Sequence, residues 1–382
     1  MRVALIETHA LPGMWKYDLG LGRALEALGD EVVVFSAACF PAGETTRGGV
    51  WRGFPDLRHQ PNLLVKGLRY TAATLRMLAA VRGGGFDVVH WQHFNVLPPL
   101  EAFTARALGP LRPRLVITVH DIDAWDAVKG GSPALLRRTF ASAARLIVHH
   151  EANRPQLAAR GGVPESRIRV VPHGSYDVFR RADLGRAAAR DQLGLPPDAP
   201  LVLFFGEIRA EKNLDGLVRA MAVVRDRIPD ARLLAAGKIR HVDPAAIIAE
   251  IDRLGLREAV DFRPVYVDDA HVDAHFAAAD VVALPYRDIT QSGVVFQAMT
   301  AGVPVVATDT GALGHTVREA GCGLVVPPGD ERALADALVG VLGDPAGAAE
   351  LGRRGRAAAA TVYSWDACAR LTREVYRELA GP

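Results

Sequence analysis

The sequence predicts an α/β protein built from two doubly wound domains, each with a parallel sheet covered by helices. Three observations indicate this fold class. The chain has 382 residues, more than one ordinary α/β core needs and enough for two. Short apolar segments alternate with helical patterns almost throughout. The alternation restarts after a polar, proline-rich stretch, GLPPDAP at residues 194–200, which is typical of a linker.

The first series of patterns predicts an N-terminal domain of residues 1–178. Parallel strands that are covered on both faces read as continuous apolar runs. Runs of this kind predict strands at 2–7, 31–36, 87–91, 114–120 and 145–150. Helical patterns between them include residues 17–28, 62–82 and 133–143.

The second series predicts a C-terminal domain of residues 179–363. Its apolar runs predict strands at 200–206, 231–237, 259–264, 280–285, 304–309 and 323–328. A last helix at 364–379 follows a break after an alanine-rich helix, and we expect residues 364–382 to pack back on the N-terminal domain. Ligands of open parallel sheets bind at the carboxyl ends of the strands, so we expect a ligand between the two domains.

Composition narrows the class of protein. The three cysteines, Cys39, Cys322 and Cys368, are far apart and form no disulfide or zinc spacing, which suits a reducing compartment. The start MRVALIETH lacks the layout of a signal peptide, and no apolar run reaches the roughly 18 residues of a membrane span. We therefore expect a cytoplasmic protein, and peripheral contact with the inner face of the membrane stays open.

The stretch FFGEIRAEKN, residues 204–213, predicts a site for anionic oxygens. Gly206 ends a strand at the edge where ligands bind, and Arg209 and Lys212 follow it. The helix that begins near Asn213 adds unpaired N–H groups. Arginine offers a fork of donors and lysine a point charge. The alternative is a solvated loop with two surface cations.

A second segment of the same domain, residues 283–312, repeats this arrangement. A strand ends, a polar loop follows, and Ser292 and Gly293 open a helix. Glycine lets the backbone approach a phosphate, and serine can cap the helix. Gln297 lies one turn into the helix, where it could reach a ribose hydroxyl. The alternative is an ordinary capped helix. It is less favoured, because the same domain already offers the cationic loop.

The order of these segments resembles the retaining glycosyltransferases of family 4 over nearly the whole chain. The matching segments are LPGMWKYDLGLGRALEALGDEV (11–32), TVHDID (118–123), VVPHGSYDVF (170–179), FFGEIRAEKNLDGLVRAM (204–221), AADVVALPYR (278–287), AGVPVVATDTG (301–311), GLVVPPGDERALADAL (323–338) and the tail YSWDACARLTREVYREL (363–379). The resemblance implies the GT-B fold, in which two Rossmann-like domains face each other across a cleft and a C-terminal helix crosses back to the N-terminal domain.

The resemblance also implies sugar transfer from a nucleotide diphosphate sugar, of UDP or GDP type, with retention at the anomeric carbon. Arg209 and Lys212 would hold the diphosphate and stabilise the leaving group. Such cations can replace a divalent metal, so we expect no metal and no cofactor. His120 matches the family's active-site histidine near the transferred sugar. The favoured mechanism is front-face attack, in which the acceptor proton passes to a donor phosphate oxygen.

Further donor contacts follow from the same resemblance. Gly13 would let the backbone come near the donor phosphates. Backbone groups near Arg263–Val265, and Val265 in particular, would face the base. Gly206, Ser292, Gly293, Val294 and Gln297 would line the rest of the donor site.

The sequence departs from the family at two places. Where many members have a Glu-x7-Glu pair, this chain has Ile289 and Gln297, and the arginine that often follows the strand-ending glycine is Glu207 here. Two alternatives therefore stay open. One is a nucleotide-sugar-binding relative or partner subunit without turnover. The other is a nucleotide-sugar epimerase, although the loop 287–293 offers only Asp288 as an acid or base.

We expect the acceptor to be a sugar, a lipid-linked molecule or a natural product, and four residues are candidates for contacting it. These are Trp15, His93, Asp121 and Trp125. Asp121 and Asp123 mimic the metal-binding Asp-x-Asp of other glycosyltransferases. We interpret them as an acidic loop, because the cationic phosphate ligands make a metal unnecessary.

Residues 62–82 predict an amphipathic helix. Lys66, Arg69 and Arg76 share one face, and a leucine face carries Leu64, Leu68, Leu75 and Leu78. The preferred interpretation is a surface helix whose leucines pack on the sheet, and the alternative is contact with anionic lipid or an anionic acceptor. Nucleic acid is not expected, because the basic excess is local and no binding module is present.

Overall fold

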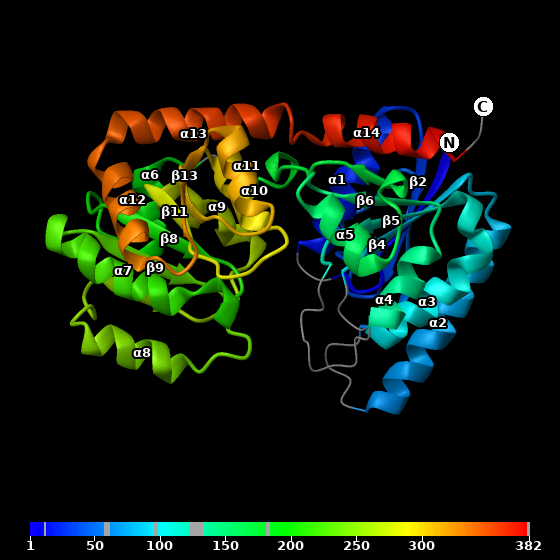
Figure 1. The fold of residues 1–382 in the computed structure, drawn as a ribbon, viewed down its shortest axis with the longest axis horizontal. Helices are drawn as coiled ribbons and strands as arrows, with labels where there is room; N and C mark the ends of the chain where they lie inside the picture. The colour runs from blue at the N-terminus through cyan, green and yellow to red at the C-terminus, as the bar shows by residue number, and fades with distance from the viewer. Residues whose placement is uncertain (11–12, 57–61, 95–97, 123–132, 181–183, 380–382) are drawn as a thin grey trace. The chain divides into compact units, whose positions relative to one another are not determined.

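The computed structural model describes residues 1–10, 13–56, 62–94, 98–122, 133–180 and 184–379. The chain divides into two compact units (Figure 1). Unit 1 comprises Met1–Gly174 and Tyr363–Pro382, and unit 2 comprises Ser175–Val362. Each unit holds one sheet, and every strand pair in both sheets is parallel. The predicted fold class is confirmed.

The sheet of unit 1 has seven strands in the order β3-β2-β1-β4-β5-β6-β7. Their bounds are β1 (Arg2–Ile6), β2 (Glu31–Ala37), β3 (Val50–Phe54), β4 (Val88–His93), β5 (Leu115–Val119), β6 (Arg145–Val148) and β7 (Ile168–Val170). The five predicted strands lie within two residues of these bounds. The two edge strands, β3 and β7, were not predicted, because Arg52 and Gly53 interrupt the first and the second is only three residues long.

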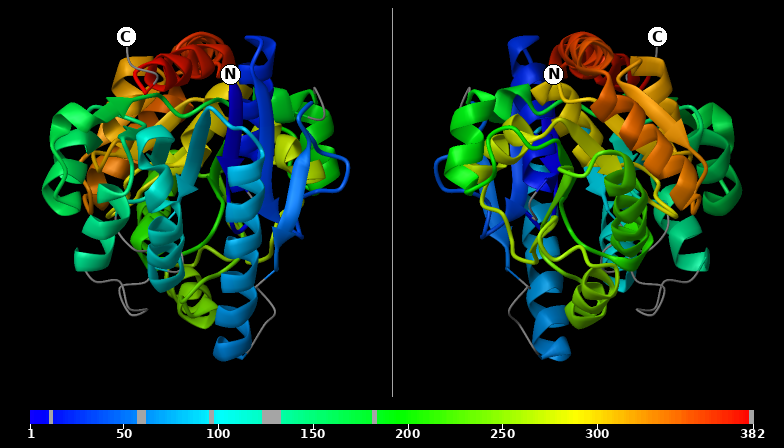
Figure 2. Two further views of the ribbon diagram at one scale, coloured as in Figure 1. Left: turned by 90° about the vertical axis from the view of Figure 1, so that its right-hand side faces the viewer. Right: turned by 90° about the vertical axis from the view of Figure 1, so that its left-hand side faces the viewer.

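Unit 1 has six helices among the described residues, and all but the last connect successive parallel strands. They are α1 (Met14–Ala27), α2 (Leu63–Gly83), α3 (Pro98–Leu108), α4 (Pro133–Ala141), α5 (Asn153–Gly161) and α14 (Trp365–Arg377), with short 3₁₀ turns η1 (Gly109–Arg114) and η2 (Glu165–Arg167). Helices α2 to α5 pack side by side in chain order, and α1 packs against α14 (Figure 2).

The C-terminal helix α14 is tied to unit 1, as the sequence predicts. The Trp365 ring lies so close to α1 that a Cβ on Gly20 would fall 2.2 Å from it. Tyr376 on the same helix lies 2.6 Å from Nδ1 of His90, which comes from β4. Glycine at position 20 therefore allows α14 to pack this closely on α1.

The sheet of unit 2 has six strands in the order β10-β9-β8-β11-β12-β13. The strand bounds are β8 (Leu201–Phe205), β9 (Arg232–Ala236), β10 (Val260–Arg263), β11 (Val281–Leu284), β12 (Val305–Thr308) and β13 (Gly323–Val326). The helices are α6 (Arg186–Leu193), α7 (Leu214–Arg227), α8 (Pro244–Arg253), α9 (Asp269–Ala278), α10 (Gly293–Ala301), α11 (Leu313–Ala320), α12 (Glu331–Gly343) and α13 (Pro345–Ala360), with 3₁₀ turns η3 (Asp177–Phe179) and η4 (Ala210–Lys212). All six predicted strands are present.

The buried face of α2 differs from the preferred prediction. Leu64, Leu68 and Leu75 do not pack on the sheet, because their exposed fractions are 79%, 72% and 54%. The helix instead buries a face centred on Tyr70 and Met77, and the Tyr70 ring packs against Phe54 of β3. The prediction holds for Leu78, which is buried, and is wrong for the other three leucines. The buried face mixes aromatic, small and polar side chains and has a weaker apolar signal than the leucines. Within the described residues, no helix combines the length and the hydropathy that a membrane crossing requires.

Candidate active site

Two glycines shape the ligand-binding edge of the sheet in unit 2. Gly206 follows β8 with a φ of +99°, in the left-handed region that favours glycine. Gly237 follows the neighbouring strand β9, and a Cβ there would fall 1.7 Å from the carbonyl oxygen of Gly206. The two strand ends can lie this close only because Gly237 has no side chain.

Lys212 lies against the strand-ending Gly206. It ends the 3₁₀ turn η4, and only 8% of the residue is exposed. Its Nζ lies 3.5 Å from the position that a Cβ on Gly206 would take, and 5.3 Å from the centroid of the Tyr286 ring. Burial, and then repulsion from Arg209, lower the pKa of Lys212 to about 8. Lys212 is thus still a cation at neutral pH, with little water around it.

Arg209 is held by carboxylates from its own loop. Its Nε lies 2.8 Å from Oε1 of Glu211 and 3.8 Å from Oε2 of Glu207. The backbone N–H of Arg287, in the loop after β11, donates to the carbonyl of Glu211 over 2.7 Å. The loops after β8 and β11 are therefore joined beside the two cations.

The N-terminus of α10 lies beside Gly206. The Cγ2 atom of Val294 is 3.4 Å from the position that a Cβ on Gly206 would take. Ser292 occupies the N-cap position, but its side chain makes no capping hydrogen bond, so the expected serine cap is wrong. The first N–H groups of α10 are therefore left without that cap. Gln297 is half-buried one turn further on.

Two other glycines allow the loops around α10 to pack closely. A Cβ on Gly293 would fall 2.8 Å from Oη of Tyr176, and a Cβ on Gly311 would fall 1.8 Å from the carbonyl oxygen of Ile289. The loop that carries Ile289 is thus packed directly on backbone. Val265, expected near the base, follows β10 and is 60% exposed.

The predicted residues of unit 1 differ in exposure. Gly13 begins α1 with a φ of +90°, and nothing lies within 4 Å of the position that a Cβ would take, so the backbone there faces open space. Trp15 is buried beside Phe40, and Asp121 is half-buried. His93 is buried, and its Nε2 lies 3.0 Å from Oε2 of Glu101. Trp125 and Asp123 lie outside the described residues.

His120 directly follows β5 and is fixed from several sides. Its ring stacks on Phe94 with centroids 4.0 Å apart, and the Tyr17 ring meets it edge-on at 4.6 Å. Nε2 of His120 lies 2.9 Å from Oε1 of Gln92, and Nδ1 lies 3.0 Å from Nε2 of His149. Both ring nitrogens therefore have protein partners, and only 8% of the residue is exposed.

The partners of His120 define where its proton sits. Nδ1 of His149 lies 3.0 Å from the carbonyl of Val171, and a carbonyl can only accept. Burial lowers the pKa of His149 to about 4, so the ring is neutral and its Nε2 accepts from Nδ1–H of His120. Burial and the neighbouring histidines hold the pKa of His120 well below its ordinary value. Neutral His120 thus keeps its proton on Nδ1. Oε1 of Gln92, which faces Nε2, can only accept, so this tautomer requires the Gln92 amide to turn its NH₂ group toward the ring.

A buried glutamate holds the backbone just after β1. Glu7 follows β1 and accepts the backbone N–H groups of His9 and Ala10 over 2.6 and 2.5 Å. Burial raises the pKa of Glu7 to about 7 and holds that of the neighbouring Asp18 well above its usual range. Glu7 thus holds residues 9 and 10 in place through hydrogen bonds to their backbone.

Sequence reasoning did not select Gln92, His149 or Glu7. A signal for them was present, because each lies at or directly after the carboxyl end of a predicted strand, where side chains of neighbouring strands converge. Their partners were not readable, because the contacts depend on the register of β4, β5 and β6.

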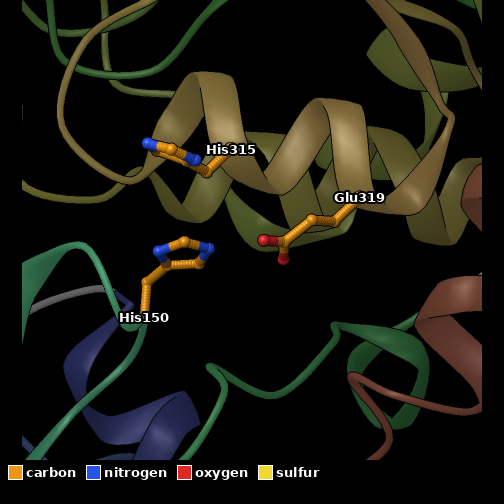
Figure 3. Close-up of side chains that lie close together, drawn as sticks. All are labelled: His150, His315 and Glu319. Atoms are coloured by element: carbon orange, nitrogen blue, oxygen red, sulfur yellow. The ribbon is translucent and has the colours of Figure 1, made fainter.

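Two side chains on α11 have metal-ligand chemistry. His315 and Glu319 lie one turn apart and project to the same side of the helix (Figure 3). The third side chain of that view, His150, belongs to the loop after β6 in unit 1. Two ligands from one helix do not complete the four that structural zinc takes, so α11 by itself defines no metal centre.

Two doubly wound units, the C-terminal helix on the first and the strand-end loops of the second define the GT-B class of glycosyltransferase. Two family models match the chain. Residues 13–175 match "Glycosyltransferase Family 4", and residues 199–344 match "Glycosyl transferases group 1".

Curated relatives extend over nearly the whole chain. A D-inositol 3-phosphate glycosyltransferase of Streptomyces avermitilis is 30% identical over 98% of this chain and 87% of the relative. The enzyme of the same name from Mycobacterium avium is 32% identical over 96% and 91%. The chain therefore belongs to glycosyltransferase family 4. The family favours a transferase over the epimerase and the non-catalytic alternatives.

Solved structures show the same fold. Sucrose-phosphate synthase from Thermosynechococcus elongatus has a TM-score of 0.77 and 25% identity, and the match covers 100% of this chain and 99% of that one. HepE from Anabaena in complex with UDP has a TM-score of 0.74 and 19% identity, with 99% and 100% covered.

Proposed function

We propose that this glycosyltransferase moves a hexosyl-type sugar from a UDP- or GDP-type nucleotide sugar to an acceptor hydroxyl, with retention and without a metal. One observation carries the proposal. Buried, cationic Lys212 lies beside Gly206, with Arg209 on the same loop and the N-terminus of α10 next to it. Unit 2 would bind the donor and unit 1 the acceptor.

The chemistry of this cluster suits a departing diphosphate. Negative charge develops on the phosphate oxygens as the glycosidic bond breaks, and preorganised donors in a dry site stabilise such charge strongly. Lys212 supplies a point charge, Arg209 a fork of N–H donors, and α10 the positive end of a helix dipole. These groups would do the work that a divalent cation does in other phosphate sites.

His120 would contribute fixed geometry rather than proton transfer. Both of its ring nitrogens are occupied, and burial holds its pKa well below neutrality. The acceptor proton would instead pass to a phosphate oxygen of the donor, on the face from which the diphosphate leaves. Front-face attack needs no carboxylate nucleophile at the anomeric carbon.

The relatives supply a first acceptor to test. Several are named D-inositol 3-phosphate glycosyltransferases, so an inositol phosphate is the first choice. Glycans, lipid-linked sugars and natural products follow. For the donor, the HepE complex shows that this fold can hold UDP in another protein.

A thermal-shift panel of UDP, GDP, ADP and TDP, with their common sugar conjugates, tests the donor site. We expect one nucleotide to raise the melting temperature of the wild type and not that of Arg209→Ala/Lys212→Ala. Equal stabilisation of both proteins would place the nucleotide elsewhere.

The stereochemistry and the metal need a separate assay. With the donor found, ¹H NMR of the fresh product should show the anomeric configuration of the donor, and excess EDTA should leave the rate unchanged. An inverted product, or a rate restored only by a divalent cation, would overturn this part of the proposal.

A further inference from the structure

The outward face of α2 is an apolar stripe. It consists of Leu64, Leu68, Ala72, Leu75 and Ala79, and all five are exposed. The spacing of four, four, three and four residues keeps them on one side of an α-helix over about four turns. In Figure 1 and in the left view of Figure 2, α2 lies at the outside of unit 1. Contiguous exposed apolar surface of this kind marks an interaction site.

Basic residues flank the apolar stripe. Arg69 and Arg76 are exposed on the adjoining side of α2, and Arg82 is exposed at its last turn. The helix sequence contains no Asp or Glu, and residues 45–82 hold seven Lys/Arg against the single acid Asp56. Within the part of the chain that the structure describes, no ion pair involves these three arginines.

We propose that α2 is a membrane-docking helix that lies in the interface of an anionic lipid bilayer. The leucines would enter the boundary between headgroups and acyl chains, and the arginines would meet lipid phosphates. The helix is not apolar enough to span a membrane, so it lies on the surface. The inference rests on α2 alone and does not depend on the donor site in unit 2.

Charge decides between a membrane and a second copy of the chain. If two copies paired through the apolar stripe, their rows of arginines would face each other without an acid on either helix to pair with. An anionic bilayer supplies the missing negative charge, and each basic residue near such a surface adds attraction. The lipid surface is therefore the occupant that fits both the apolar and the charged part of the face.

Flotation of the full chain with liposomes tests the proposal. The vesicles are phosphatidylcholine alone and phosphatidylcholine with phosphatidylglycerol, each at low and at physiological salt. We expect binding to the anionic vesicles only, weakened by salt because exposed charges are screened. No binding to anionic vesicles at low salt would overturn the inference.

Variants separate the two parts of the face. Leu64→Ser/Leu68→Ser/Leu75→Ser should abolish flotation, and Arg69→Glu/Arg76→Glu should lower the partition coefficient roughly tenfold or more. These side chains are exposed, so the variants should keep the wild-type melting temperature, which is measured alongside.

Matched controls come from unit 2. Ile248→Ser changes an exposed apolar residue of α8, and Arg332→Glu/Arg353→Glu reverses two exposed charges on α12 and α13. Both controls should float like the wild type. Equal loss in the controls and the α2 variants would overturn the assignment to α2. A second result would also overturn it: analytical ultracentrifugation shows a dimer that dissociates in the leucine variant, and neither the wild type nor the variants bind vesicles.

Discussion

The carboxyl ends of β5 in unit 1 and β8 in unit 2 carry opposite electrostatic arrangements. After β5, His120 is neutral and both ring nitrogens are used by Gln92 and His149. After β8, the chain buries the cation Lys212 beside Arg209, and the carboxylates of Glu207 and Glu211 lie next to Arg209. Burying a cation is costly unless something pairs with it. Unit 1 therefore provides fixed geometry, whereas unit 2 buries a lysine cation with which an anionic ligand could pair.

Removing the charge in unit 2 should have the largest effect. Arg209→Ala/Lys212→Ala should lower kcat/KM by about a thousandfold, because the donors that stabilise the leaving diphosphate are lost. Steady-state kinetics with the donor found in the thermal-shift panel measure this. Arg332→Ala, an exposed arginine of α12, is the matched control and should stay at wild-type activity. A loss of less than threefold in the double variant would contradict the donor site.

Adding one methyl group at the end of β8 should test the same donor site more finely. Gly206→Ala places a Cβ 3.5 Å from Lys212 Nζ and costs about 1 kcal/mol or more of folding stability at this positive φ. We expect the donor KM to rise about tenfold, because the Cβ, in ordinary van der Waals contact with Lys212 and Val294, would occupy space beside Nζ that the diphosphate needs. Gly194→Ala is the control, because Gly194 also has a positive φ but has open space around it. If both variants have the same KM, the contact with Lys212 is irrelevant to binding.

A change behind His120 should affect turnover and not donor binding. His149→Phe removes the acceptor of His120 Nδ1–H, so the imidazole loses its fixed tautomer, and we expect kcat to fall roughly tenfold with the nucleotide Kd unchanged. His149→Gln, whose amide oxygen can accept that proton, should recover part of the rate. The ¹⁵N NMR shifts of His120 report the tautomer directly. Equal kcat in the two variants, or a change in Kd, would show that His149 is not a positioning residue.

The pH dependence of nucleotide binding should be the smallest of the four effects. Lys212 is protonated below its pKa of about 8 and neutral above it, and a bound diphosphate favours the protonated form. Affinity should therefore fall as pH rises above 8, by up to about tenfold per unit. Calorimetry between pH 7 and 9.5 measures this. Lys212→Arg, which stays charged, should give a flat profile, and a flat profile in the wild type would contradict the linkage.

The fold was largely predictable because parallel strands that are buried on both faces leave continuous apolar runs. The run PLVLFFG at 200–206 became β8 to within a residue at each end. The failures have physical causes. Edge strand β3 contains Arg52 and Gly53, and three of the four leucines of the predicted packing face of α2, all but Leu78, belong to its outward face.

The candidate site was predictable where one loop carries the chemistry, as in the stretch from Gly206 to Lys212. It was not predictable where partners come from several strands. The chain from Val171 through His149 and His120 to Gln92 depends on the register of the sheet. No local pattern in the sequence encodes which of these residues meet.

A crystal structure of the chain with the nucleotide that stabilises it would test the donor assignment most directly. We predict diphosphate oxygens within hydrogen-bond distance of Lys212 Nζ and the Arg209 guanidinium, with the N-terminus of α10 pointing at them. If the diphosphate instead lies away from Gly206 and makes no contact with Lys212, the assignment of unit 2 as the donor-binding unit is contradicted.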